Sequence, residues 1–164
     1  MTVNEVDLLT LLRDLDDPEW LEWPGYYDRG ETAVLFGSLV ARLEDSFAAR
    51  CTAEQDAQDS SEYGRVVVPA EATVCGTRIV VCVSKFGSLA LVCTDNPGAF
   101  FGTDDAQAEA ALDAADLAKV DRALVDLGYA VVPEELLELD YDEPSRLPRH
   151  VQRPTWWHRF FGTF

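Results

Sequence analysis

Two adjacent apolar segments near the middle of the chain, residues 78–84 and 88–94, limit the possible folds more than any other feature. A short connection containing Gly87 joins them, and glycine tolerates the positive φ that tight hairpins require, so we predict an antiparallel β-hairpin. Successive side chains of a strand point to opposite faces, yet Val81 and its neighbour Cys82 are both apolar. We therefore expect strands that are covered on both faces or central in a sheet, with little room for a polar site.

The segments around this hairpin predict the rest of the sheet. Residues 65–68 precede it as a third strand, and Asp113 begins a helix that Gly128 ends. Residues 129–132 then form a short strand, so that strand, crossover helix and strand make one βαβ step. The predicted fold class is α+β. Its small, mainly antiparallel sheet consists of a three-stranded meander plus one short strand after a crossover helix, packed with helices.

Apolar residues recur at helical spacing in two more segments, residues 4–15 and 31–50, which we predict to be amphipathic helices. Residues 52–62 contain no large apolar side chain and predict an exposed loop. Pro133 opens another short helix, and Thr155 caps a terminal turn that carries aromatic residues.

The length of 164 residues is typical of one domain, and an apolar content of 48% supplies a substantial core. We predict a single domain over residues 1–164, in which the basic, aromatic segment 144–164 packs back onto the rest. The four cysteines form no C-x-x-C pair, which favours reduced, buried thiols over zinc ligands or disulfides.

The formal net charge of −17 is unevenly distributed. Residues 1–62 and 95–143 carry −11 and −12, whereas residues 63–94 carry +2 and residues 144–164 carry +4. Such a field repels nucleic acid and anionic membranes and accelerates the encounter with a basic protein, which is the partner we predict. An acidic surface that serves solubility alone is the alternative.

Because the sequence shows no signal peptide and no apolar run that spans a bilayer, we expect a cytoplasmic protein.

The sequence contains no motif for nucleophilic catalysis or for cofactor binding. The pattern G-x-S-x-G is absent, and the only histidines, His150 and His158, lie in the basic C-terminal segment. Neither of the glycine-rich nucleotide-binding motifs occurs. We predict a non-enzymatic protein with no catalytic residues, no metal ligands and no cofactor.

Two clusters of carboxylates are candidate binding residues for a basic partner. They are Asp14, Asp16 and Asp17, and Asp140, Asp142 and Glu143. Divalent cations also prefer oxygen ligands, so a metal-dependent hydrolase built on one cluster is an alternative. Neither cluster follows the calcium-loop pattern, and a chain with 30 acidic residues produces such neighbours by chance, which favours solvated surface carboxylates.

The segment 19–28 combines aromatic and acidic side chains around a turn at Pro24 and Gly25. Trp and Tyr dominate interface hot spots and accept cations on their ring faces. For the two tryptophans themselves, the sequence favours core packing behind the first helix over exposure, and this is the alternative to an interface. A surface without an aromatic patch here would favour a structural or regulatory domain without a dedicated partner. The candidate binding residues of the segment are Glu19, Trp20, Glu22, Trp23, Tyr26, Tyr27 and Asp28.

Three segments of the C-terminal third form a further pattern: residues 127–135 (LGYAVVPEE), 139–142 (LDYD) and 156–161 (WWHRFF). Together they resemble bacterial immunity proteins, the cytoplasmic antidotes of polymorphic or contact-dependent toxins. The resemblance implies inhibition by occlusion, with carboxylates standing where a nuclease toxin would place substrate phosphates. We therefore hypothesise an acidic immunity protein that neutralises a basic, nuclease-like toxin domain by covering its active site.

Overall fold

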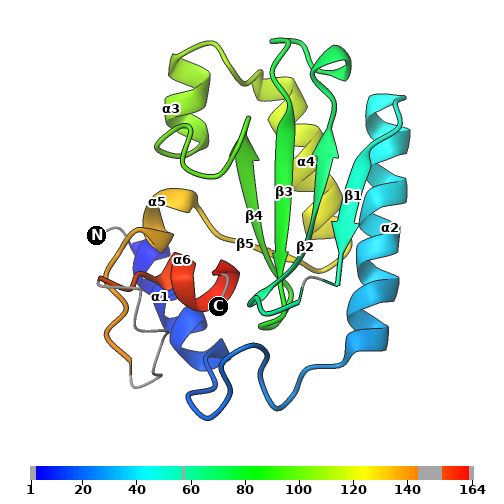
Figure 1. Cartoon of the computed structure of the whole chain (residues 1–164). Coiled ribbons are helices and arrows are strands. Elements are labelled where there is room, and N and C mark those ends of the chain that lie inside the picture. Colours follow the sequence, from blue (N-terminus) through cyan, green and yellow to red (C-terminus); the bar gives the residue numbers. More distant parts are fainter. Residues whose placement is uncertain (1–2, 57, 144–152, 163–164) are drawn as a thin grey trace.

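The computed structural model describes residues 3–56, 58–143 and 153–162. Within these residues the chain forms a five-stranded sheet in the order β1-β2-β3-β4-β5 (Figure 1). The first four strands pair antiparallel, and β5 pairs parallel with β4. The predicted α+β class is confirmed, including the crossover that brings β5 beside β4. The strands are β1 (Thr52–Gln55), β2 (Glu62–Val68), β3 (Ile79–Ser84), β4 (Leu89–Thr94) and β5 (Ala130–Val131).

Strand β1 corrects the prediction of an exposed loop over residues 52–62 and adds a fifth strand to the four predicted. Every residue of β1 is exposed, so no apolar alternation marks the segment as a strand. Its extended conformation comes from pairing with β2, where Glu54 lies opposite Arg65. Gly64 of β2 permits this close approach, because a Cβ atom there would clash with the carbonyl oxygen of Glu54. Tertiary pairing, and not intrinsic propensity, makes this edge strand.

Helices before, between and after the strands complete the fold. Helix α3 was not predicted, whereas the start of α4 is as predicted: the Asp113 side chain accepts hydrogen bonds from the backbone N–H groups of Ala115 and Asp116. Among the residues that the structure describes, no helix has the length and apolar content needed to cross a membrane. The helices are α1 (Val3–Leu15), α2 (Arg29–Phe47), the 3-10 helix η1 (Ala70–Ala72), α3 (Thr103–Ala108), α4 (Ala114–Asp126), α5 (Glu134–Leu137) and α6 (Trp156–Phe161).

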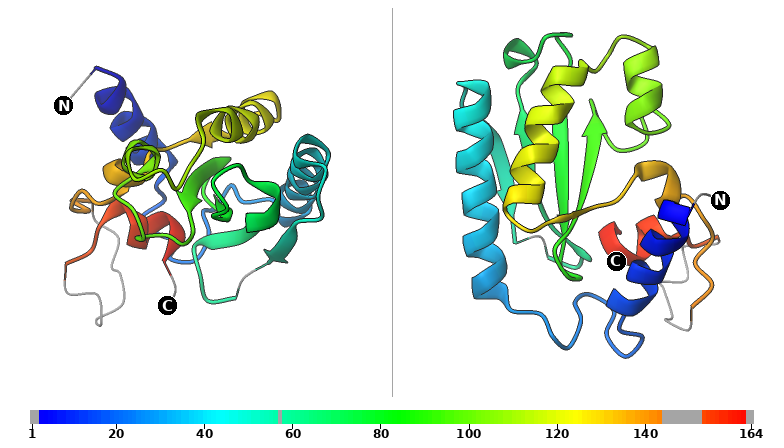
Figure 2. Two further views of the ribbon diagram at one scale, coloured as in Figure 1. Left: turned by 90° about the horizontal axis from the view of Figure 1, so that it is seen from above. Right: turned by 180° about the vertical axis from the view of Figure 1, so that it is seen from behind.

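The helices cover both faces of the sheet (Figure 2). On one face, α2 and α4 contribute Phe36 and Leu124 to an apolar cluster that includes Val81 of β3. On the other face, α1, α5 and α6 build a second cluster, in which Phe160 packs with Cys82 of β3. Every residue of β3 and β4 is buried. The prediction of a hairpin that is covered on both faces is therefore confirmed.

Helix α6 returns the chain to the second face of the sheet, beside α1 and α5 (Figure 1). Trp156 and Phe160 of this helix are buried and stack with ring centroids 5.6 Å apart. The predicted packing of residues 144–164 can thus be followed over residues 153–162. The other residues of that segment lie outside the described part of the chain.

Candidate functional site

The connection between α1 and α2, residues 16–28, which we call the aromatic loop, has a backbone held by its own polar groups. The Asp17 carboxylate accepts a hydrogen bond from the Gly25 N–H at 2.9 Å. The Tyr26 hydroxyl donates to the carbonyl oxygen of Leu15 at 2.7 Å. Asp17, predicted as a surface carboxylate for a partner, thus also closes the turn that Pro24 and Gly25 begin.

A buried arginine from α6 fixes the aromatic loop from the inside. Arg159 is fully buried, and its Nε donates to Oδ1 of Asp16 at 2.5 Å. Its two terminal nitrogens donate to the carbonyl oxygens of Asp17, Trp20 and Leu21 at 2.8, 2.6 and 2.9 Å. One guanidinium therefore donates to three backbone carbonyls of a loop without regular structure, of which Asp17 also accepts the Trp20 N–H and Leu21 also accepts the Ser61 hydroxyl.

Asp16 is the ionic partner of this guanidinium and lies inside the fold. Its side chain is 3% exposed, and the Tyr141 hydroxyl donates to its second oxygen. The guanidinium also lies over the Phe86 ring, 4.3 Å from the ring centroid. The prediction that Asp16 is a solvated carboxylate available to a partner is wrong, because Arg159, far away in sequence, reaches it.

The large apolar side chains of the aromatic loop point outward in spite of this fixed backbone. Trp20 and Trp23 are 46% and 39% exposed, and Leu21 and Tyr26 are 38% and 52% exposed. The alternative of two core tryptophans is therefore wrong. An exposed apolar patch on a well-ordered backbone is typical of an interaction surface, since protein surfaces seldom gather such side chains.

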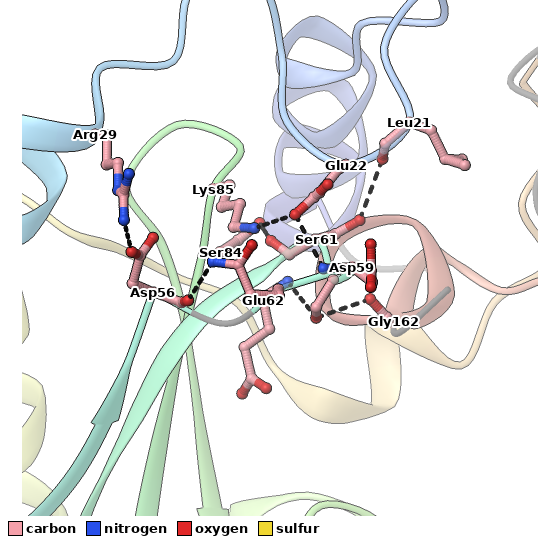
Figure 3. A network of polar contacts seen from close by, with 12 residues as sticks. Leu21, Glu22, Arg29, Asp56, Asp59, Ser61, Glu62, Ser84, Lys85 and Gly162 are labelled. Carbon is pink, nitrogen blue, oxygen red and sulfur yellow. Dashed lines mark hydrogen bonds and ion pairs between the residues drawn. The ribbon is translucent and has the colours of Figure 1, made fainter.

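A second network joins the aromatic loop to the turn between β3 and β4 (Figure 3). The Lys85 side chain is 3% exposed, and its ammonium group pairs with the Glu22 carboxylate at 2.9 Å. The same carboxylate accepts the Asp59 N–H at 3.1 Å. The ammonium also lies 5.6 Å from the centroid of the Trp23 ring. Glu22, predicted to bind a partner, is thus already engaged within the protein.

The predicted carboxylate clusters, which are far apart in sequence, are brought together by Arg13 of α1. This arginine pairs with Asp142 and with Glu143, both at 3.2 Å. Asp14, which follows it in α1, is exposed, as is Asp140. The two clusters therefore lie on one side of the molecule, where α1 meets the segment after α5 (Figure 1).

The remaining predicted site residues border the aromatic patch. Glu19 and Asp28 are exposed, and Asp28 also caps α2 by accepting the Glu31 N–H at 2.9 Å. Tyr27 is half-buried and lines two hollows, of about 330 and 200 Å³, together with Lys85. The larger hollow is bounded by Glu22, Trp23, Tyr27, Arg29, Asp56, Gln58 and Lys85.

Two tyrosines of the loop have raised pKa values. Burial, reinforced by Asp17 and Asp16, raises the pKa of Tyr26 to about 12. Burial, followed by the proximity of Tyr63, likewise raises the pKa of Tyr27 to about 12. At neutral pH both phenols are therefore protonated: the Tyr26 hydroxyl donates to Leu15, whereas the buried Tyr27 hydroxyl has no hydrogen-bond partner among the residues that the structure describes.

Two of the four thiols, Cys51 and Cys82, also have raised pKa values. Cys82 and Cys93 are buried as predicted, whereas Cys51 and Cys75 are only partly buried. Burial and the nearby Glu44 raise the pKa of Cys51 to about 11, and a hydrogen bond with Cys93 followed by burial raises that of Cys82. Both shifts oppose the thiolate that cysteine catalysis requires.

His158 has a structural role, and the described residues form no metal site. His158 Nδ1 accepts the backbone N–H of Thr155 at 3.0 Å and so caps α6. Over the described ranges, no group of three or more His, Cys, Asp and Glu side chains is arranged to hold a metal ion. His150 lies outside the described residues.

Two residues that organise the site, Arg159 and Lys85, were not predicted to do so. Each is a cation next to apolar segments, Arg159 within the run of residues 156–161 and Lys85 directly after β3. A cation in such a position needs a buried or partly buried partner, and this is the signal that could have found them.

Comparison of the chain with protein-family models, with curated proteins and with solved structures found no match.

Proposed function

We propose that this chain is a non-enzymatic binding protein that docks a basic protein domain on its aromatic loop. The observation that carries the proposal is the set of four exposed apolar side chains, Trp20, Leu21, Trp23 and Tyr26, on a backbone fixed by Arg159. A preorganised loop loses little conformational entropy on binding. More of the free energy of its contacts therefore contributes to affinity. The aromatic patch also disfavours a domain without a dedicated partner.

Charge supports a basic partner. The net charge of −17 attracts a cationic surface over long range, and exposed carboxylates at Asp14, Glu19 and Asp28 border or lie near the patch. Long-range attraction of this kind accelerates association, while aromatic contacts slow dissociation. In this proposal the acidic side chains accelerate association, and the aromatic side chains slow dissociation from the same interface.

The specific role we propose is that of an immunity protein against a nuclease-like toxin. A nuclease active site binds a polyanion, so a surface rich in carboxylates can occupy it in place of substrate. The resemblance of residues 127–135, 139–142 and 156–161 to immunity proteins supports this role. In this proposal the chain inhibits by covering the toxin and takes no part in catalysis.

Co-purification with the product of the neighbouring gene tests the proposal most directly. We expect a tagged chain to retain a basic protein at low salt, and the association rate to fall as the salt concentration rises, because salt screens the attraction. If no basic protein is retained at low salt, the proposal is wrong.

A double substitution in the patch tests its location. Trp20→Ser with Tyr26→Ser removes two hot-spot side chains, so we expect affinity for that partner to fall by about thirtyfold or more, equivalent to about 2 kcal/mol. Phe101→Ser is the matched control, because Phe101 is 66% exposed and lies outside the loop. Equal affinities for the double variant and the control would remove the aromatic loop from the interface.

A further inference from the structure

A further hollow, of about 460 Å³, lies between α2 and α4, the helices that cover the first face of the sheet. The two helices lie side by side there (Figure 2). Small side chains on α4 leave the space open between them, and the polar residues project from helical positions that face one another. The lining residues are Arg42, Ser46, Ala115, Ala118, Lys119 and Arg122.

The charge of this lining is opposite to that of the protein. Three of its six residues are basic and none is acidic, although the chain contains 13 basic and 30 acidic residues. On α4, Ala115, Ala118, Lys119 and Arg122 follow the spacing of one helical stripe, so both cations project to the same side. A gathering of cations in a hollow of so acidic a chain needs its own explanation.

Among the side chains that the structure describes, two of the three cations have carboxylate partners and one has none. Arg42 pairs with Asp126 at 2.6 Å through one terminal nitrogen. Lys119 lies 3.8 Å from Asp116 and 5.0 Å from the centroid of the Phe47 ring. Asp116 is itself buried and accepts the backbone N–H of Val74 at 2.7 Å, so its charge is shared.

Arg122 provides the unbalanced positive charge. It is exposed, and within the part of the chain that the structure describes it makes no ion pair or side-chain hydrogen bond. Arg42 keeps donors beyond the nitrogen that contacts Asp126, and the Ser46 hydroxyl is a further donor on the same wall. These donors are suited to the oxygens of one anion.

We infer that this hollow binds a small oxyanion, a phosphate or carboxylate group carried by a small molecule. Guanidinium groups match the geometry of both anions by donating two hydrogen bonds in one plane. A concave site between helices is suited to a small ligand rather than to a flat protein surface. The inference is independent of the aromatic loop and of the proposed toxin partner.

Nuclear magnetic resonance titration of the ¹⁵N-labelled full chain tests this site. Pyrophosphate, inorganic phosphate and citrate are added separately at constant ionic strength, with sodium chloride as the reference titration. We expect saturable shifts of backbone amides in residues 42–46 and 115–122 that chloride does not reproduce. The stronger of the phosphate and citrate responses identifies the anionic group that the site prefers.

Substitutions then assign the response to the cations. We expect Arg122→Gln to weaken binding about tenfold, as the loss of one charge-assisted contact would, and Arg42→Gln with Arg122→Gln to abolish it. Arg153→Gln is the control, since it removes the same charge from an exposed position just before α6 and should leave binding unchanged. Absence of a saturable, localised shift, or equal affinity in the double variant and the control, would overturn the inference.

Discussion

The β3–β4 hairpin and the aromatic loop are both well ordered, but they are ordered by opposite means. The hairpin is held by apolar side chains on both faces, and its two strands are neighbours in sequence. The loop keeps its apolar side chains outside and is held by Arg159, which lies 138 to 143 residues beyond Leu21 and Asp16. A loop can thus expose aromatic rings and still have a fixed backbone when a buried side chain, here Arg159, hydrogen-bonds that backbone in place of apolar packing.

The largest effect is expected from breaking the loop's internal support. Arg159→Met leaves Asp16 buried without a counter-charge and removes one hydrogen-bond donor from each of three carbonyls, so we expect a loss of about 3–5 kcal/mol in the free energy of unfolding. Denaturant titration measures this. Adding Asp16→Leu should restore part of the loss, because the uncompensated charge disappears. An unchanged midpoint for Arg159→Met would show that the loop is held in another way.

A core truncation in the hairpin should lower the free energy of unfolding slightly less than Arg159→Met does, and it should leave the aromatic loop in place. Leu91→Ala removes a fully buried side chain from β4, and we expect a loss of about 2–5 kcal/mol from transfer and cavity terms. Unlike Arg159→Met, this change should leave the indole N–H resonances of Trp20 and Trp23 unaltered, because these rings lie in the aromatic loop, whereas Trp156 shares a buried cluster with Leu91 and can respond to the truncation. Shifted indole resonances of Trp20 and Trp23 in Leu91→Ala would contradict the independence of the two regions.

The ion pair of Lys85 and Glu22, which joins the hairpin to the loop, should contribute less to the free energy of unfolding than either of these features. Lys85→Met keeps an apolar stem of similar volume but removes the partner of Glu22, whose side chain is 25% exposed and can be rehydrated. We expect a loss of about 1 kcal/mol in the free energy of unfolding. Lys119→Met, at a side chain that is 46% exposed, should have a smaller effect. A larger loss for Lys119→Met than for Lys85→Met would contradict this order.

Alkaline pH should produce the mildest change. The pKa of Tyr26 and Tyr27 rises from 10 to about 12 in the folded chain, so folding favours the protonated phenols. Their contribution to stability is present below pH 10 and declines as the pH rises from 10 through 12. Tyrosinate absorbance should show a late-ionising component that Tyr26→Phe reduces. Ionisation of all tyrosines near pH 10 would disagree with this prediction.

The hairpin, α4 and the β5 crossover could be predicted because their signals are local. Asp113 begins α4 and Gly128 follows it with φ of +88°, and two continuous apolar runs joined by a short turn with Gly87 identify β3 and β4. Strand β1 could not be predicted, since its residues are all exposed and only pairing with β2 extends them.

The aromatic loop was selected as a candidate site from its residue types, whereas the roles of its residues inside the fold were not predicted. The aromatic side chains of residues 19–28 could be selected because their residue type suits an interface. The structural roles of Asp16 and Glu22 could not, because their partners Arg159 and Lys85 are distant in sequence. The sign of a residue's charge is readable in a sequence, whereas the partner that neutralises it is set by the tertiary fold.

The contact between Arg159 and the aromatic loop also has a consequence for biosynthesis. The ribosome makes Arg159 143 residues after Asp16, and a nascent chain emerges from its N-terminus onward. The loop carbonyls therefore have no guanidinium partner until α6 has left the exit tunnel, even when all five strands are already outside. A chain that stalls before α6 is translated would lack the guanidinium that holds the aromatic loop, so under the proposed function incomplete products would bind the partner more weakly than finished ones.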